Sequence, residues 1–229
     1  MQYGVPFSSA PSFVAQSAPQ VQAQFLRKVY GTFFGALLVA VLTGAYCAQE
    51  TVAPLVMGMW QLLLVVLFIG GFAIHFLRRT TGLNLVLFGL YAALWGAVLG
   101  PMLGLLHAVA PGVPVQAGIL TVGVFGCLTL YVLQTGKDFQ WMGGLLFAAL
   151  VSMMLCSLVM VFFSVPFLST LYSFVGVMVF SGYVLYDTSE IMHRLTPDEA
   201  ITGSIELFID FVGLFLHIVS LLTSLNSRD

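Results

Sequence analysis

Four acidic residues near the C-terminus stand within sequence that is otherwise apolar. Asp187 and Glu190 lie near the end of one apolar run, while Glu206 and Asp210 lie inside the next. A charged side chain at the centre of a bilayer costs about 3 kcal/mol on insertion scales, so such residues face the bundle interior or a water-filled path rather than lipid. These acids are therefore the first candidates for a functional site.

The acids of the last run recur at helical spacing. Glu206, Asp210 and His217 fall at i, i+4 and i+11, so they share one face of a helix. A short turn makes this helix the antiparallel neighbour of the one before it, and we expect acids from both to meet inside the bundle. Counting outward from the turn places Glu206 opposite Asp187, whereas a helix tilt would bring Asp210 there instead, and the sequence leaves both pairings open.

Two carboxyl groups brought together away from water cannot both ionise cheaply, so they should share one proton. The protonated pair can hold two helices together by a hydrogen bond, whereas the ionised pair repels and offers oxygen ligands to a cation. Two carboxylates supply at most four of the six to eight oxygens that Ca²⁺ takes. A pair of carboxylates from these two helices therefore suits transient Ca²⁺ binding in a permeation path better than tight storage.

The other polar residues of this region have two readings each. His217 could relay protons along the polar face, or it could be a buried neutral histidine bonded to a hydroxyl group. Glu190 is interpreted as an interfacial residue that either snorkels to the membrane surface or pairs with Arg194 or His193.

Composition identifies an integral membrane protein. Of the 229 residues, 60% are hydrophobic and 7% are charged, with a mean hydropathy of +1.05, whereas soluble domains are about 25% charged. The net charge of -2 and the scattered Lys and Arg residues exclude a nucleic-acid footprint. The chain has no H-E-x-x-H and no G-x-S-x-G motif. We therefore expect neither an enzyme nor a bound cofactor.

Seven apolar runs, separated by Pro, Gly and charged residues, are each long enough to cross the bilayer. They cover residues 29–48, 54–77, 82–106, 114–134, 140–163, 167–191 and 203–225. The fold class is thus an all-α membrane protein, a seven-transmembrane-helix bundle whose last helix is central because its polar face avoids lipid. A six-span alternative would move some basic loops to the wrong side.

The chain divides into a flexible polar tail, residues 1–24, and a membrane domain, residues 25–229. Six of the seven basic residues fall on one side of the predicted topology, which the positive-inside rule makes cytoplasmic together with the N-terminus. Thr196, Pro197 and Glu199 form a helix-start signal, so the last helix should begin near Pro197.

Small residues four apart predict close contacts between helices. Two such pairs occur in the chain, Gly31 with Gly35 and Gly100 with Gly104.

Several motifs together resemble the Bax inhibitor-1 family, also called the transmembrane Bax inhibitor motif family. Tyr186-Asp187-Thr188, and the later run from Glu206 to Asp210, resemble its two signature helices. Gly100-Pro101, and Lys137-Asp138-Phe139 with Gly143-Gly144, are similar to the bacterial YccA-like branch. The resemblance covers about residues 25 to 225.

The resemblance implies a last helix enclosed by two three-helix layers and a pH-sensitive Ca²⁺ leak channel gated by protonation of a buried aspartate pair. That pair would be Asp187 and Asp210, and Arg78 is the positional match for a basic residue that latches it. For the YccA-like branch it also implies the bacterial inner membrane and association with the membrane protease FtsH. The alternative function is therefore an interaction protein that modulates FtsH, with the N-terminal tail as the handle.

Overall fold

The computed structural model describes residues 13–77, 83–162 and 166–226, and these residues form helices and loops without any strand. Three short 3-10 turns, η1 (Val14–Gln16), η2 (Gln140–Met142) and η3 (Pro197–Glu199), accompany the α-helices. The α-helices are α1 (Pro19–Cys47), α2 (Ala53–Gly58), α3 (Trp60–Leu77), α4 (Leu83–Val109), α5 (Val113–Thr135), α6 (Gly143–Phe162), α7 (Pro166–His193) and α8 (Ala200–Asn226).

The helices confirm the predicted class of membrane bundle. Within the described residues, six candidate membrane spans have the required length and hydropathy: α1, α4, α5, α7, and α6 and α8 with their preceding 3-10 turns. The apolar α3 adds a shorter helix of 18 residues, about 27 Å at 1.5 Å per residue. One predicted span, residues 54–77, is divided into α2 and α3 at Met59.

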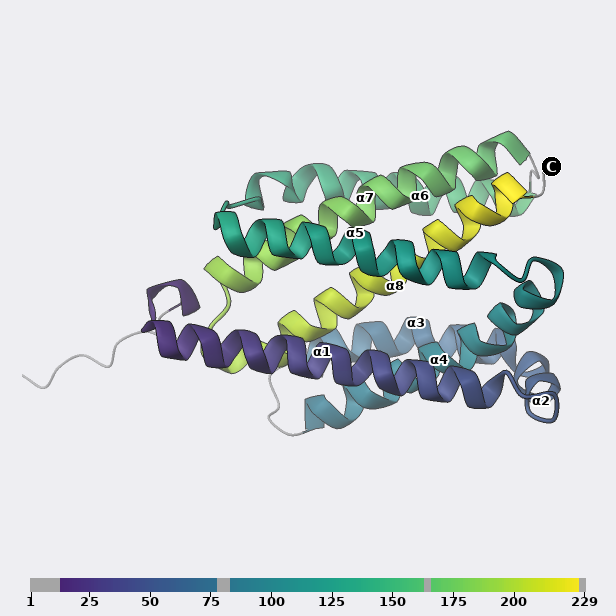
Figure 1. Cartoon of the computed structure of the whole chain (residues 1–229), viewed down its shortest axis with the longest axis horizontal. Coiled ribbons are helices and arrows are strands. Elements are labelled where there is room, and N and C mark those ends of the chain that lie inside the picture. The colour runs from purple at the N-terminus through teal and green to yellow at the C-terminus, as the bar shows by residue number, and fades with distance from the viewer. Residues whose placement is uncertain (1–12, 78–82, 163–165, 227–229) are drawn as a thin grey trace, which may run out of the picture.

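Helix α8 occupies the centre of the bundle. It contacts α1, α4, α5 and α7, and Figure 1 shows it crossing between a group formed by α1, α3 and α4 and a group formed by α5, α6 and α7. Many of its residues are buried, whereas α6 exposes most of its surface. The central last helix follows from its polar face, as predicted.

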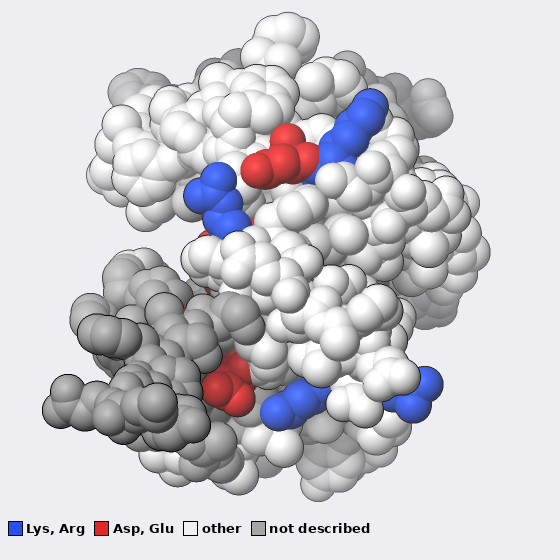
Figure 2. All heavy atoms as spheres, turned by 90° about the vertical axis from the view of Figure 1, so that its left-hand side faces the viewer, with Lys and Arg blue, Asp and Glu red and all other residues white. Residues whose placement is uncertain are grey.

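Basic side chains gather at one end of the bundle, which we call the basic end. Arg27 and Lys28 lie in the first turns of α1, Lys137 follows α5, and Arg194 follows α7, and all four are exposed. Figure 2 views this end and shows Lys and Arg with acidic side chains between them. The positive-inside rule assigns the basic end to the cytoplasm.

The predicted polar tail of residues 1–24 is too long. Helix α1 begins at Pro19, and residues before it form η1. Val14 is buried, and its backbone N–H donates a hydrogen bond of 2.9 Å to the carbonyl oxygen of Leu195. The chain from Phe13 onward is therefore bound to the turn between α7 and α8, because an apolar side chain and a backbone donor both find partners there.

The start of the last helix agrees with its sequence signal. The backbone N–H and the hydroxyl of Thr196 donate to Oε2 of Glu199 at 3.0 and 3.1 Å. Pro197 opens η3, which leads directly into α8. A capping interaction thus fixes where the central helix enters the bundle.

Glycines let α1 and α4 approach each other at backbone distance. A Cβ atom on Gly100 would overlap the backbone of Gly44, and one on Gly96 would overlap the carbonyl group of Ala40. The seam formed by Gly44, Gly96 and Gly100 therefore requires residues without side chains. The prediction for Gly100 is confirmed.

The other predicted small-residue pair makes no such contact. A Cβ on Gly31 or Gly35 would meet no heavy atom within 4 Å. These two glycines face away from the neighbouring helices, so the predicted close approach there is wrong.

We predict that Gly100→Ala lowers the free energy of unfolding in detergent by about 1–3 kcal/mol, because the added methyl group forces α1 away from α4. Gly89→Ala is the matched control, since Gly89 lies on the same helix and a Cβ there would meet open space. That variant should be unchanged or more stable because alanine favours helix over glycine. Equal effects of the two substitutions would show that the seam is not tightly packed.

Candidate functional site: an acid pair between α7 and α8

Helices α7 and α8 run antiparallel, and their register is set by contacts along their length. The hydroxyl groups of Ser173 and Ser220 are 2.6 Å apart, His217 packs on Gly176, and the ring of Phe180 packs on Gly213. Continued by whole turns, this register places Asp187 level with Glu206 and Tyr183 level with Asp210. Counting residues outward from the turn therefore predicts correctly which backbone positions of α7 and α8 lie opposite each other.

The carboxyl groups nevertheless pair differently. Asp187 and Asp210 lie within hydrogen-bonding reach of each other. The Cα–Cβ bonds of a helix tilt toward its N-terminus, so in antiparallel helices the side chains of Asp187 and Asp210 lean toward each other. By the same tilt Glu206 leans away from Asp187. We call Asp187 and Asp210 the acid pair.

The acid pair is enclosed by the bundle. Asp187 is 9% exposed and Asp210 is 3% exposed. The ring of Tyr183 lies near both carboxyl groups. Two further carboxylates flank the pair, with Glu190 near Asp187 and Glu206 near Asp210. Glu206 is half-buried, so the acids form a row from the basic end into the interior.

One oxygen of the pair needs a further partner. Among the described residues, none donates a hydrogen bond to the buried Oδ2 of Asp210. Buried polar atoms in folded proteins almost always have a partner. A shared proton, a water molecule or a cation would each meet this requirement, and each would make the contact between α7 and α8 depend on what occupies the pair.

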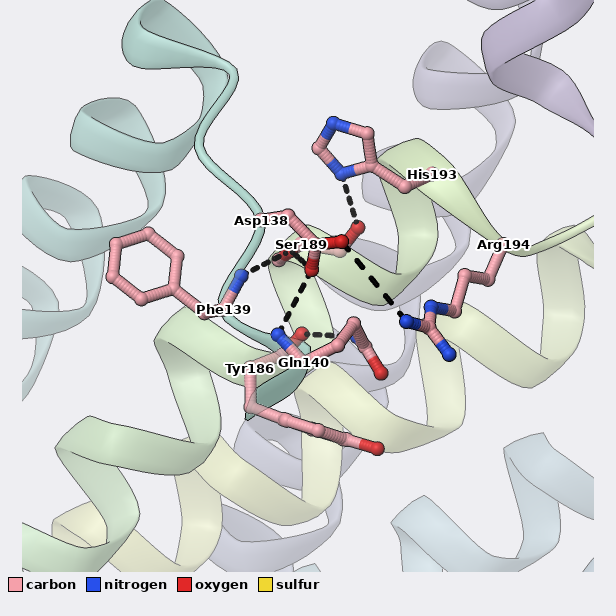
Figure 3. A network of polar contacts seen from close by, with 7 residues as sticks. All are labelled: Asp138, Phe139, Gln140, Tyr186, Ser189, His193 and Arg194. Carbon is pink, nitrogen blue, oxygen red and sulfur yellow. Dashed lines mark hydrogen bonds and ion pairs between the residues drawn. The ribbon is translucent and has the colours of Figure 1, made fainter. Parts of the chain in front are cut away.

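The helical turn that carries Asp187 is held by the loop between α5 and η2, residues 136–139 (Figure 3). The backbone N–H of Phe139 donates to the hydroxyl oxygen of Ser189 at 3.0 Å, and this hydroxyl donates to Oδ1 of Asp138 at 3.4 Å. The side chain of Gln140 donates to the carbonyl oxygen of Tyr186 at 3.4 Å. These bonds flank Asp187 on both sides along the chain and fix the rotation of its helix.

Three polar residues beyond the acid pair have other partners than predicted. Arg194 pairs with Asp138 at 4.0 Å on the exposed surface, and Nδ1 of His193 lies 2.9 Å from the carbonyl oxygen of Ser189. Glu190 instead lies within hydrogen-bonding reach of Tyr186. The predicted pairing of Glu190 with Arg194 or His193 is therefore wrong, because the loop residue Asp138 reaches the arginine, whereas the interpretation of Glu190 as a snorkelling interfacial residue stays a prediction.

His217 does not join the acid pair. It lies two turns further along α8, between the rings of Tyr172 and Phe180, whose centroids are 5.4 and 5.3 Å away. Phe180 also covers Gly213, which is the residue between His217 and Asp210 on the polar face. The aromatic ring thus interrupts the predicted polar stripe.

Two further predictions concern a latch and a metal. Arg78, the candidate latch, lies outside the described residues. Within the described part of the chain, no three His, Cys, Asp or Glu side chains form a group that could hold a metal ion.

Sequence reasoning did not identify Ser189 or Phe180. Ser189 is buried and bonded to the loop, yet a serine beside three other polar residues of α7 carries no distinguishing signal. Phe180 is one of 20 phenylalanines. Its position opposite Gly213 becomes visible only when the register is known.

Comparisons with known proteins agree on one relationship. The family model described as "Inhibitor of apoptosis-promoting Bax1" matches residues 22–227. The chain is 33% identical to Bax inhibitor 1 of Schizosaccharomyces pombe, over 94% of this chain and 82% of that protein. It is 34% identical to the Golgi anti-apoptotic protein of Vaccinia virus, over 95% and 92% of the two chains. An uncharacterized protein of Helicobacter pylori is 31% identical over 90% and 88%.

We predict that Asp187→Asn and Asp210→Asn are not additive in thermal unfolding in detergent. Each single replacement already removes the shared proton, so the double variant should differ from the sum by about 0.5–3 kcal/mol. Glu50, an exposed acid at the opposite end of the bundle, provides the control. Asp187→Asn combined with Glu50→Gln should be additive within about 0.5 kcal/mol. Additivity in the first combination would mean that the two aspartates do not interact.

Proposed function

Because the chain belongs to the Bax inhibitor-1 family of membrane proteins, we propose that it is a pH-sensitive Ca²⁺ leak channel gated by protonation of the acid pair. The observation that supports this most is the meeting of Asp187 and Asp210, on two different helices, inside an apolar bundle. A proton between them links α7 to α8. Its loss leaves two negative charges that repel each other.

The helices on either side of the acid pair are anchored separately. The hydroxyl of Ser204 donates to the carbonyl oxygen of Val29 at 2.9 Å, which joins α8 to α1. On the other side, Ser189 joins α7 to the loop before α6. Repulsion between Asp187 and Asp210 therefore acts between two braced units, and the contact that it loosens is the one between α7 and α8.

The flanking acids suit Ca²⁺ as the transported ion. Glu190 and Glu206 extend the row of carboxylates from the acid pair toward the basic end, and charges of one sign gathered in one place concentrate the opposite ion. Ca²⁺ prefers carboxylate and carbonyl oxygens together with water. The ion would move along this row and complete its shell with water, without any catalytic step or cofactor.

Rising pH should increase the flux. Protonation keeps α7 and α8 together at acidic pH, and loss of the proton at higher pH separates them. We predict that purified protein in liposomes passes Ca²⁺ faster as the pH rises, as measured with a dye trapped inside the vesicles. The variant with both Asp187→Asn and Asp210→Asn should lose this pH dependence, because an amide does not titrate.

Glu50→Gln is the matched control for this experiment, since it removes an exposed acid at the end of the bundle far from the pair. Its flux and pH profile should equal those of the unmodified protein. If the double asparagine variant keeps the original flux and pH profile, the acid pair does not gate the channel.

As a second proposal, the protein binds the membrane protease FtsH in the bacterial inner membrane and modulates its action. This rests on the similarity to the YccA-like branch, and bacterial relatives occur in Helicobacter pylori. Residues from Phe13 onward are bound to the bundle through Val14. The segment that FtsH binds in this proposal is therefore residues 1–12 and not the longer tail expected from the sequence.

Deleting residues 2–12 should abolish co-purification with FtsH while Ca²⁺ flux continues. A deletion of residues 2–24 is a poor test, because it removes Val14 and the first turns of α1 and so destabilises the bundle. Replacement of residues 2–12 by a Gly-Ser segment of equal length controls for length alone. Undiminished association after the deletion would exclude this segment as the handle.

A further inference from the structure

An apolar cavity of about 560 Å³ lies between α1, α4, α5 and α8. Its walls include Ala48 near the end of α1, His107 near the end of α4, and Pro114 and Gly118 in the first turns of α5. These segments lie at the end of the bundle opposite the basic end, where Figure 1 shows α1 ending and α5 beginning. The cavity therefore belongs to the far half of the membrane.

Three phenylalanine rings pack together beside this cavity, and one of them, Phe211, forms part of its wall. Phe33 of α1 stacks on Phe125 of α5 with centroids 5.2 Å apart, and both contact Phe211 of α8 at 5.9 and 5.4 Å. Phe33 and Phe125 are buried, and Phe211 lines the cavity. We call these three residues the ring cluster.

The ring cluster is linked both to the cavity and to the helical turns that carry the acid pair. Phe211 follows Asp210 in α8 and also forms part of the cavity wall. On the opposite helix, Phe33 lies one turn from Tyr30, whose hydroxyl is near that of Thr188, the residue after Asp187. The ring cluster thus adjoins the turns that carry the acid pair through both α1 and α8, and its ring Phe211 faces the cavity.

We propose that the ring cluster is the hydrophobic gate of the ion path and that the cavity is its vestibule at the far side of the membrane. This inference rests on the leak-channel function proposed above. Apolar constrictions block ions by excluding the water that hydrates them. The acid pair is then the switch, and the ring cluster is the barrier that the switch opens.

A second pair of buried phenylalanine rings in the same core provides a control for truncation of the ring cluster. Phe88 of α4 and Phe208 of α8 are also buried and form an edge-to-face pair with centroids 5.5 Å apart. The ring partner of Phe88 is Phe208, whereas the ring partner of Phe125 is Phe211, which lines the cavity. Truncating Phe88 therefore loosens the core to a similar extent without removing a residue of the gate.

The first test measures Ca²⁺ leak into liposomes at acidic pH, where the acid pair is protonated and the unmodified channel is closed. Phe125→Ala should raise this leak about tenfold, which corresponds to a barrier lower by about 1.4 kcal/mol. Phe88→Ala should leave it unchanged. Thermal unfolding and size-exclusion profiles establish that each variant is folded before its flux is measured.

The second test fills the vestibule. A Cβ on Gly118 would meet open space, and Gly118 lines the cavity, so Gly118→Phe places a ring there without a backbone clash. It should lower the flux at alkaline pH about tenfold. Gly126→Phe is the matched control, because Gly126 lies on the same helix, is equally open and does not line the cavity.

The outcomes separate the gate from the channel. If Phe88→Ala raises the acidic leak as much as Phe125→Ala, or Gly126→Phe blocks flux as well as Gly118→Phe, the gate is overturned. If asparagine at the acid pair alters flux but neither Phe125→Ala nor Gly118→Phe does, the gate fails and the leak channel remains. If the unmodified protein passes no Ca²⁺ at any pH, both proposals fail.

Discussion

The architecture depends on two carboxyl groups that meet in the buried interior of the bundle. Asp187 and Asp210 come from antiparallel helices whose side chains lean toward each other, so the register of α7 on α8 decides that they pair. Their burial requires α8 to be enclosed on all sides, and α1, α4, α5 and α7 provide that enclosure. The need to bury this polar contact thus explains why α8 lies at the centre and the other helices surround it.

The contacts near the acid pair divide the bundle into two braced parts. Ser204 ties α8 to α1, and the glycine seam ties α1 to α4 at backbone distance. On the other side, Ser189 ties α7 to the loop that precedes α6. Each part is held by close packing or by hydrogen bonds of its own, and the acid pair lies at the boundary between them.

Sequence patterns predicted the helices well because long apolar runs ended by Pro, Gly and charged residues have few other solutions in a membrane. They also placed α8 at the centre, since its acids avoid lipid. The partner of Asp187 stayed open because counting residues gives the level of each backbone position and ignores the tilt of the side chain. The role of Gly44 and the binding of Val14 could not be predicted, because each depends on a partner far away in the sequence.

The bond between Ser204 and Val29 spans 175 positions of the chain, and Val14 reaches Leu195 over a similar span. During synthesis α1 enters the membrane first, whereas its partners on α8 leave the ribosome last. The glycine seam lets α1 pack against α4, which is synthesised before α8. The contacts of the N-terminal segment and the burial of the acids are therefore completed only when the last helix is in place.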